Sequence, residues 1–248
     1  MTSTALDSTM DNQSLWSQTA RVSAIDRVLS RLAKQGTLPP HQSCTGEEAV
    51  LVGAAAAMDP NDWIFWGRQV NAAALLRGVS TETLFSYELF GLNPEAIAAQ
   101  NVVISTAGAA TRVPHAVGLA HAGQHDNRVV LCELGNGVIT DGDFHVGLTF
   151  AGVLNAPVVF VVRSDDPRDM SLRGAGYGIH TDRVSGDDPE AVQKTVRSAV
   201  DRARAGNGPT LIEAIVHREE SVVQEAQWTA FEEETALALA RAEARSNA

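Results

Sequence analysis

The chain has 248 residues, 44% of them hydrophobic, and a formal net charge of −11. This length suits one sizeable core, and the acidic balance excludes a nucleic-acid surface, which requires clustered Lys and Arg. Segment 1–14 is polar without an apolar signal core, and no apolar run reaches membrane-spanning length. We therefore expect a cytoplasmic protein that does not bind membranes, with a flexible N-terminus over 1–14 and one domain over 15–248.

The two cysteines, Cys44 and Cys132, lie far apart in apolar or small-residue surroundings. They show no metal-ligand spacing. Free thiols in a reducing compartment are expected, without a disulfide.

The first third of the chain is predicted to be mostly helical. Apolar residues recur at helical spacing over 15–32, and an Ala-rich helix is expected over 47–58. Ser80 stands where it can cap the start of a helix over 82–90, and Gly91 can close that helix.

From Val102 onward, apolar strands alternate with helices. After a short strand at Val102, strands are predicted over 128–134, 157–162 and 210–216, and helices over 114–122, 141–155, 189–205 and 228–245. Alternation of this kind implies parallel pairing. The predicted fold class is α/β, a mostly parallel doubly wound sheet flanked by helices.

The most informative segment joins two of these strands. Strand 128–134 ends in Gly135-Asn136-Gly137, and strand 157–162 is followed by Ser164-Asp165-Asp166. Parallel strands bring their carboxyl ends to the same edge, where ligands of doubly wound sheets bind. Oxygen-bearing side chains delivered there can hold a hard divalent cation against a diphosphate.

This unit resembles the thiamine-diphosphate motif, which reads Gly-Asp-Gly and, further along, Asn-Asn. The Asp position is occupied by Asn136 and the last Asn position by Asp165, so the amide and the carboxylate have exchanged places. We interpret the exchange as compensated, because it conserves charge and oxygen ligands. The resemblance implies a thiamine-diphosphate-binding fold that holds the cofactor through Gly135, Asn136, Gly137, Val138, Asp165 and Pro167, and Mg²⁺ through Asn136, Asp165 and the backbone carbonyl of Pro167.

Segments outside this motif narrow the resemblance. They are Gly46-Glu47-Glu48-Ala49, Asp59-Pro60-Asn61-Asp62-Trp63, Leu76-Arg77-Gly78-Val79-Ser80, Val113-Pro114-His115-Ala116-Val117-Gly118, Gly186-Asp187-Asp188 and Gly208-Pro209-Thr210-Leu211-Ile212-Glu213. In this order they resemble the alpha subunit of the first component of 2-oxo acid dehydrogenase complexes of the pyruvate, branched-chain or acetoin type. The resemblance covers most of the chain.

Two further residues receive roles from this resemblance. Arg68 stands where the family has the Arg of a Tyr-Arg pair that grips the diphosphate, whereas the Tyr position is Gly67 and a later His position is Val70. His41 matches the family's catalytic His if one residue is inserted, and an imidazole there would stabilise charge or transfer a proton. Alternatively, Arg68 is a solvent-facing arginine and His41 a loop histidine.

The function implied is that of an alpha-like subunit that decarboxylates a 2-oxo acid and passes an acyl or aldehyde unit to a lipoyl carrier or another acceptor. In the family the Glu that activates the cofactor comes from a beta subunit, so an alpha2-beta2 assembly is expected. Two alternatives remain at this point. One is a transketolase-like N-terminal half, and the other is a structural or regulatory subunit that has lost cofactor binding.

Overall fold

The sheet of this protein is entirely parallel and has the strand order β2-β1-β3-β4-β6-β5. The structure is a computed structural model that describes residues 14–38, 41–67, 72–104, 108–166, 171–217 and 221–246. The strands are β1 (Trp63–Trp66), β2 (Val102–Ile104), β3 (Val130–Gly135), β4 (Val158–Ser164), β5 (His180–Ser185) and β6 (Thr210–Ile215). The predicted α/β class with a mostly parallel sheet is confirmed.

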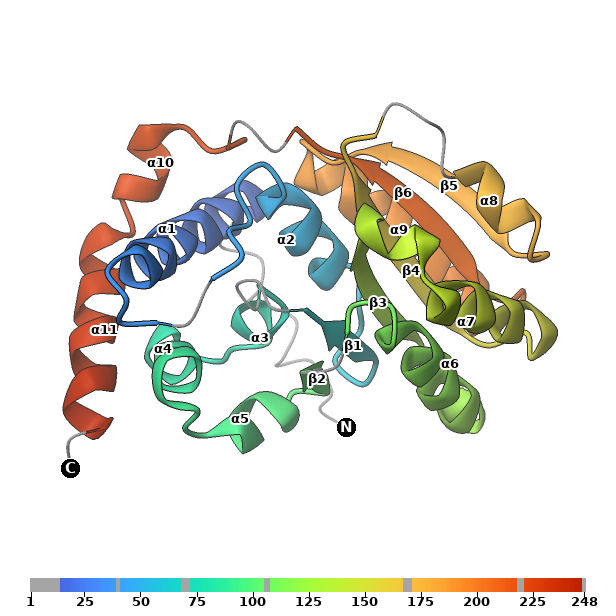
Figure 1. Ribbon diagram of the computed structural model, residues 1–248, viewed down its shortest axis with the longest axis horizontal. Coiled ribbons are helices and arrows are strands. Elements are labelled where there is room, and N and C mark those ends of the chain that lie inside the picture. The colour runs from blue at the N-terminus through green and yellow to red at the C-terminus, as the bar shows by residue number, and fades with distance from the viewer. Residues whose placement is uncertain are drawn as a thin grey trace, which may run out of the picture.

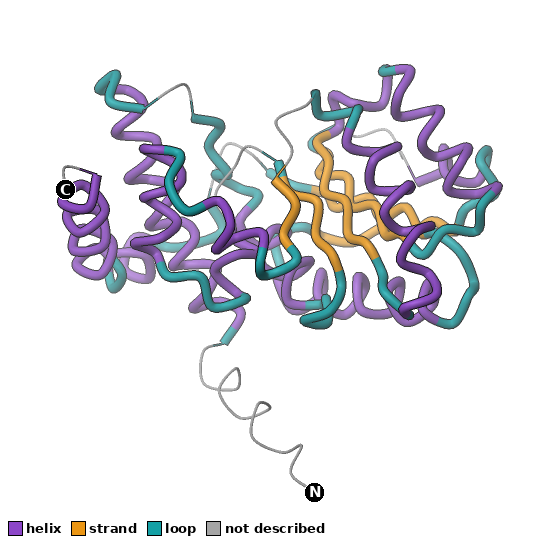
Figure 2. Tube along the Cα trace, turned by 90° about the horizontal axis from the view of Figure 1, so that it is seen from below, coloured by secondary structure: helices purple, strands orange, loops and turns teal. Residues whose placement is uncertain are grey.

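Helices cover both faces of the sheet, and a further group lies beyond its β2 edge (Figures 1 and 2). The helices are α1 (Leu15–Lys34), α2 (Glu48–Ala56), α3 (Ala72–Leu76), α4 (Thr81–Phe90), α5 (Pro94–Ala98), α6 (Arg112–Gly123), α7 (Gly142–Val153), α8 (Ser171–Ala175), α9 (Pro189–Arg204), α10 (Glu225–Thr229) and α11 (Glu232–Ser246). Short 3₁₀ helices are η1 (Gln124–Asp126) and η2 (Asn136–Thr140). Among the described residues, none of these helices is both long and apolar enough to span a membrane.

Both caps predicted for α4 are confirmed. The Ser80 hydroxyl accepts a hydrogen bond from the Thr83 N–H at 3.1 Å. Gly91 ends the helix in the left-handed conformation, with φ of 67°, and its N–H donates to the carbonyl of Tyr87. A glycine fits this position because it lacks the Cβ that penalises left-handed backbone.

The core consists of one apolar layer on each face of the sheet. Along β4, Val159 and Val161 belong to the layer shared with α1, α2 and α9, whereas Phe160 and Val162 belong to the layer shared with α6 and α7. Successive side chains of a strand point to opposite faces, so a strand covered on both sides is apolar throughout. This explains the uninterrupted apolar run before Arg163.

Several predicted boundaries differ from the structure. β1 was not predicted, because its four residues give no period-2 pattern. β5 was missed because it is an edge strand with mostly exposed and polar side chains. The predicted helix over 228–245 is two helices, α10 and α11, separated by a turn at 230–231.

The winding direction of the sheet reverses between β1 and β3. From β1 the chain continues to β2 on one side, and from β3 it continues to β4 on the other. In open α/β sheets, ligands bind in the crevice outside the carboxyl ends of the strands at such a switch point. The carboxyl ends of β1 and β3, at Trp66 and Gly135, therefore mark the edge where a ligand is expected.

Candidate active site

The exchanged residues of the motif are in direct contact. Asn136 begins η2 immediately after β3, and Asp165 immediately follows β4. The two strands pair in register, with Gly135 opposite Arg163. The Asn136 Nδ2 donates a hydrogen bond to Asp165 Oδ1 at 2.7 Å. The two side chains therefore lie together, as predicted from the sequence.

The glycines of the turn leave open space above the strand ends. A Cβ atom added at Gly135, Gly137 or Gly142 would meet no atom of the described residues within 4 Å. None of the three has a positive φ, so backbone conformation does not require glycine there. Open space at these positions would let a ligand approach the backbone.

These residues fit a magnesium diphosphate by their donor chemistry. Mg²⁺ prefers oxygen ligands and usually retains waters, and Asn136 and Asp165 offer an amide and a carboxylate. No cluster of three or more His, Cys, Asp or Glu side chains suited to a metal is present in the described part of the chain. The predicted site does not need one, because it uses a single carboxylate.

Two of the predicted cofactor residues, Arg68 and Pro167, lie outside the described residues. Their roles stay predictions. Val138 lies within η2 and buries its side chain in the layer beneath α6 and α7. It can therefore face a cofactor only through its backbone.

A buried charged cluster lies beneath the strand ends. Arg163 Nη1 forms an ion pair with Glu47 Oε2 at 2.6 Å, and both side chains are almost fully buried. Burial raises the pKa of Glu133 to about 8, although Arg163 and Arg112 oppose the rise. Glu133 is thus mostly protonated at neutral pH.

Sequence reasoning missed this cluster. Its members lie on β3, on β4, at the start of α6 and, for Glu47, in the turn immediately before α2. The available signal was a charged residue inside a fully apolar strand, such as Glu133 between Cys132 and Leu134. Charged side chains are almost never fully buried unless they are paired, so an interruption of this kind indicates a function or a partner.

His41 is held by a carboxylate in a different part of the molecule. Its Nε2 lies 2.7 Å from Asp26 Oδ1, and its side chain is 3% exposed. Asp26 also accepts hydrogen bonds from the Ser43 hydroxyl at 2.6 Å and from the Cys44 N–H at 3.1 Å. The loop after α1 is thereby fixed to that helix through one buried carboxylate.

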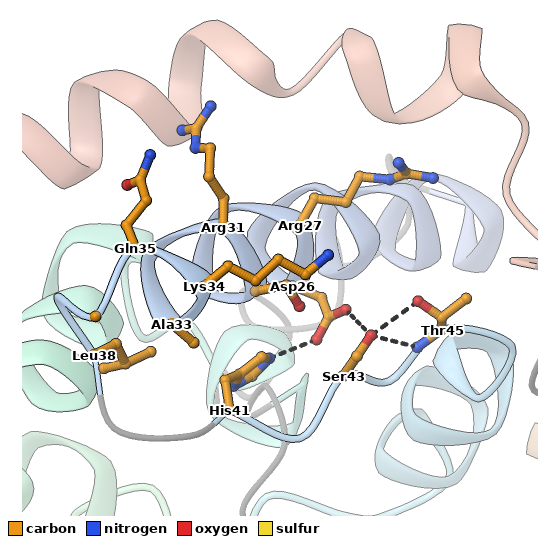
Figure 3. A pocket seen from close by; sticks show the side chains of 12 residues that line it. Asp26, Arg27, Arg31, Ala33, Lys34, Gln35, Leu38, His41, Ser43 and Thr45 are labelled. Atoms are coloured by element: carbon orange, nitrogen blue, oxygen red, sulfur yellow. Dashed lines mark hydrogen bonds and ion pairs between the residues drawn. The ribbon is translucent and has the colours of Figure 1, made fainter.

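His41 also lines a cavity of about 1100 Å³ whose other lining residues include Arg27, Arg31 and Lys34 (Figure 3). This cavity shares no lining residue with the contact between Asn136 and Asp165. The catalytic role of His41 stays a prediction.

The two cysteines are free, as expected, and both are fully buried. Burial raises the pKa of Cys132 to about 12. Neither thiol forms a disulfide, and a thiol this poorly ionised is a poor nucleophile.

Comparison with solved structures defines the class of fold. The chain resembles transketolase from Campylobacter jejuni, with a TM-score of 0.56 and 16% identity over 94% of this chain and 48% of that one. It also resembles a transketolase from Pichia stipitis, with a TM-score of 0.51 and 18% identity over 94% of this chain and 46% of that one. Identities this low show the fold alone, which is the transketolase-like α/β fold.

The family model described as the dehydrogenase E1 component matches residues 18–221. This protein belongs to the dehydrogenase E1 component family, and the resemblance stated from its sequence is confirmed. The human mitochondrial 2-oxoisovalerate dehydrogenase subunit alpha is 32% identical over 229 residues, which cover 82% of this chain and 51% of that protein. The Bacillus subtilis 2-oxoisovalerate dehydrogenase subunit alpha is 32% identical over 220 residues, covering 78% of this chain and 67% of the relative.

A third relative is the 3-methyl-2-oxobutanoate dehydrogenase subunit alpha of Mycobacterium tuberculosis, 32% identical over 214 residues that cover 78% of this chain and 57% of that one. All three relatives are alpha subunits. The chain spans about half the length of the human relative it matches.

Proposed function

We propose that this chain is an alpha-type subunit of a thiamine-diphosphate-dependent 2-oxo acid dehydrogenase or decarboxylase that is active only with a beta-like subunit. The observation that carries the proposal is the contact between Asn136 and Asp165 at 2.7 Å, at the edge where a doubly wound sheet binds ligands. Membership of the E1 component family supports the reaction class.

The chain's own residues would bind and orient the cofactor. Asn136, Asp165 and the carbonyl of Pro167 would hold Mg²⁺, and the open turn at Gly135 and Gly137 would let the diphosphate approach the backbone. The cofactor, when bound, supplies the electron sink for loss of carbon dioxide from a 2-oxo acid. The protein supplies position and electrostatics, and a lipoyl carrier or another acceptor would take the product.

A beta-like partner is part of the proposal. The resemblance assigns the cofactor-activating Glu to the beta side, and the relatives are named as alpha subunits. We therefore propose an alpha2-beta2 assembly in the cytoplasm. Full-rate decarboxylation of 2-oxo acids by the isolated alpha chain would contradict the need for this partner.

The test is a calorimetric titration of thiamine diphosphate into the chain co-purified with the beta-like protein encoded beside it. The titration is done with Mg²⁺ and repeated after addition of a chelator. Saturable binding that disappears with the chelator is the expected result. Absence of heat from a properly assembled complex would reject the proposal.

A non-catalytic subunit is the second candidate, and one observation favours it. The Nε2 of His41 is already engaged by Asp26 in a nearly closed environment, as expected of a histidine that stabilises a loop. The positions of the family's Tyr and second phosphate-binding His are Gly67 and Val70. This candidate predicts an assembled complex that binds no cofactor, so the same titration separates the two.

The transketolase-like alternative rests only on a shared fold. It predicts use of sugar phosphates as donors of a ketol unit, whereas the proposed function predicts use of 2-oxo acids. The family match over residues 18–221 favours the 2-oxo acids. Turnover of sugar phosphates but not of 2-oxo acids by the assembled complex would favour the alternative.

A further inference from the structure

Arg112 is a buried cation that forms no ion pair with a described carboxylate, although it interacts electrostatically with the nearby Glu133. It is the first residue of α6, and only 6% of its surface is exposed. Its Nε donates to the carbonyl of Ala109 at 3.3 Å. Its Nη1 has no hydrogen-bond partner, and no described carboxylate forms an ion pair with it. Burial of an unpaired charge is costly, so such a group indicates a missing anion.

The guanidinium of Arg112 lies beside the switch point of the sheet. A Cβ atom at Gly67 would be only 2.6 Å from the Arg112 Nη1. Gly67 immediately follows β1, whose carboxyl end borders that of β3. Arg112 therefore occupies the space of a side chain at position 67, where the family's phosphate-binding Tyr would begin.

The nearby charges leave Arg112 available to an anion. Burial lowers the pKa of Arg112, and the charge of Arg163 lowers it further, whereas Cys132 and Glu133 act in the opposite direction. The carboxylate of Glu47 in the same cluster is already paired with Arg163 at 2.6 Å. Arginine's planar fork of donors matches phosphate oxygens, and it keeps its charge even when buried.

We propose that Arg112 contacts the diphosphate of the cofactor from the space that Gly67 leaves free, and so replaces the contact that the family makes with Tyr. This inference rests on the proposed function, because the diphosphate is that of the proposed cofactor. The glycine and the arginine would then form one compensated pair, as Asn136 and Asp165 do at the metal.

The test is calorimetric binding to the complex with the beta-like subunit, for the wild type, Arg112→Gln and Arg112→Lys. Thiamine diphosphate and inorganic diphosphate are titrated in the presence of Mg²⁺, and thiamine serves as a ligand without phosphates. Arg112→Gln should weaken both phosphate ligands by about tenfold to a hundredfold, because a charge-assisted hydrogen bond is lost. Thiamine binding should not change, and Arg112→Lys should restore part of the affinity.

Gly67→Ala provides an independent variant that keeps Arg112. Its new methyl group would push the flexible end of the arginine aside, so affinity for diphosphate should fall while the melting temperature stays close to that of the wild type. Arg128→Gln is the matched control. Arg128 stacks over Trp63 at the amino end of β1, so removal of its charge should leave diphosphate affinity unchanged.

Failures of the two proposals are distinguishable. If the wild type binds thiamine diphosphate and folded Arg112→Gln binds it within twofold, the role of Arg112 is wrong and the proposed function stands. If the wild type binds no thiamine diphosphate, the proposed function is wrong. The binding of inorganic diphosphate then tests whether Arg112 forms an anion site. Diphosphate binding that Arg112→Gln abolishes would support the anion site, and no diphosphate binding would overturn it.

Discussion

The amide nitrogen of Asn136 donates to the Asp165 carboxylate at 2.7 Å, across the ends of two neighbouring parallel strands. Only one of the two consecutive aspartates after β4 makes this contact. The next one, Asp166, instead donates its backbone N–H to the Ser164 hydroxyl at 3.2 Å. Asp165 is exposed whereas Asp166 is half-buried, so the two aspartates occupy different surroundings although they are adjacent in sequence.

Asp165→Ala should weaken magnesium-dependent binding of thiamine diphosphate far more than Asp166→Ala. The first change removes the only carboxylate of the proposed metal site, and the second leaves that carboxylate in place. Calorimetric titration of both variants in the assembled complex checks the difference. Equal losses would contradict the alignment of Asp165 with the family's last Asn.

Asn136→Asp restores the family residue but places a second carboxylate against Asp165. Without Mg²⁺ the variant should lose about 1 kcal/mol of stability, because a hydrogen bond becomes a like-charge contact. Mg²⁺ should recover this loss and should bind more tightly than to the wild type. Melting temperatures measured over a magnesium series check the prediction, and a metal-independent loss would argue against a cation between the two side chains.

The buried Glu133 makes stability depend on pH. Burial raises its pKa from 4.5 to about 8 in the folded protein. Between these values the unfolded chain releases a proton that the folded chain keeps, so this group's contribution lowers stability as pH rises, and the loss is complete above about pH 8. The stability of Glu133→Gln should therefore decline less with pH. At pH 8.5 its free energy of unfolding should exceed that of the wild type by at least about 1 kcal/mol.

Thermal unfolding at intervals from pH 5 to pH 9 measures this effect, and Glu88→Gln serves as its comparison. Burial also raises the pKa of Glu88, to about 7, so that group acts in the same direction. The benefit of Glu88→Gln should therefore reach its maximum at a lower pH than that of Glu133→Gln. Parallel curves for the wild type and Glu133→Gln would show that Glu133 is ionised in the folded protein.

Asp62 should be the most sensitive residue of the Asp59-to-Trp63 segment. Its fully buried carboxylate accepts from the Val129 N–H at 2.9 Å, from the Asp59 N–H at 3.0 Å and from Arg204 at 2.7 Å. Asp62→Ala should cost on the order of 3 kcal/mol, because Arg204 and two backbone donors lose their acceptor. Urea unfolding measures the cost.

Asp59→Ala is the matched control for Asp62. The Asp59 side chain is 46% exposed and pairs with Arg197 and Arg204, each at 2.8 Å. Exposed ion pairs contribute about 1 kcal/mol or less, so the loss should be small. Similar losses for Asp59→Ala and Asp62→Ala would mean that burial of Asp62 does not set the strength of this network.

His41→Gln distinguishes a proton-transfer role from a structural one. If His41 acts in the reaction, turnover of 2-oxo acid should fall about a hundredfold or more while affinity for thiamine diphosphate is kept. If His41 only anchors its loop to Asp26, the variant should lose stability, and any loss of activity should follow the loss of folded protein. Melting temperature, cofactor affinity and kcat on the same preparation separate the two results.

Prediction from sequence succeeded where a local pattern determines structure. The apolar runs ending at Gly135 and before Asp165 fixed two neighbouring parallel strands, and the contact at their ends followed from the parallel arrangement. It failed for β1, an interior strand of four residues whose place depends on pairing with the distant β2 and β3. Local patterns do not carry information about such pairing.

The same limit applies to the candidate site. Asn136 and Asp165 were predicted because they interrupt a known motif, whereas the proximity of Arg112 to Gly67 depends on how α6 packs against the end of β1. His41 was predicted from its distance along the chain to a family motif, and that distance contains no information about its carboxylate partner Asp26. Whether a charge is buried and unpaired is a property of the folded chain.

The position of β1 between β2 and β3 constrains the order in which this protein can fold during synthesis. β1 ends at Trp66, but its neighbour β3 begins only at Val130, so the ribosome must release much more chain before β1 can acquire both partners. Pairings between distant segments form slowly because the intervening loop must first be closed. The helical first third should therefore stay unanchored on the ribosome until β3 emerges, and this nascent segment is where chaperones would be most needed.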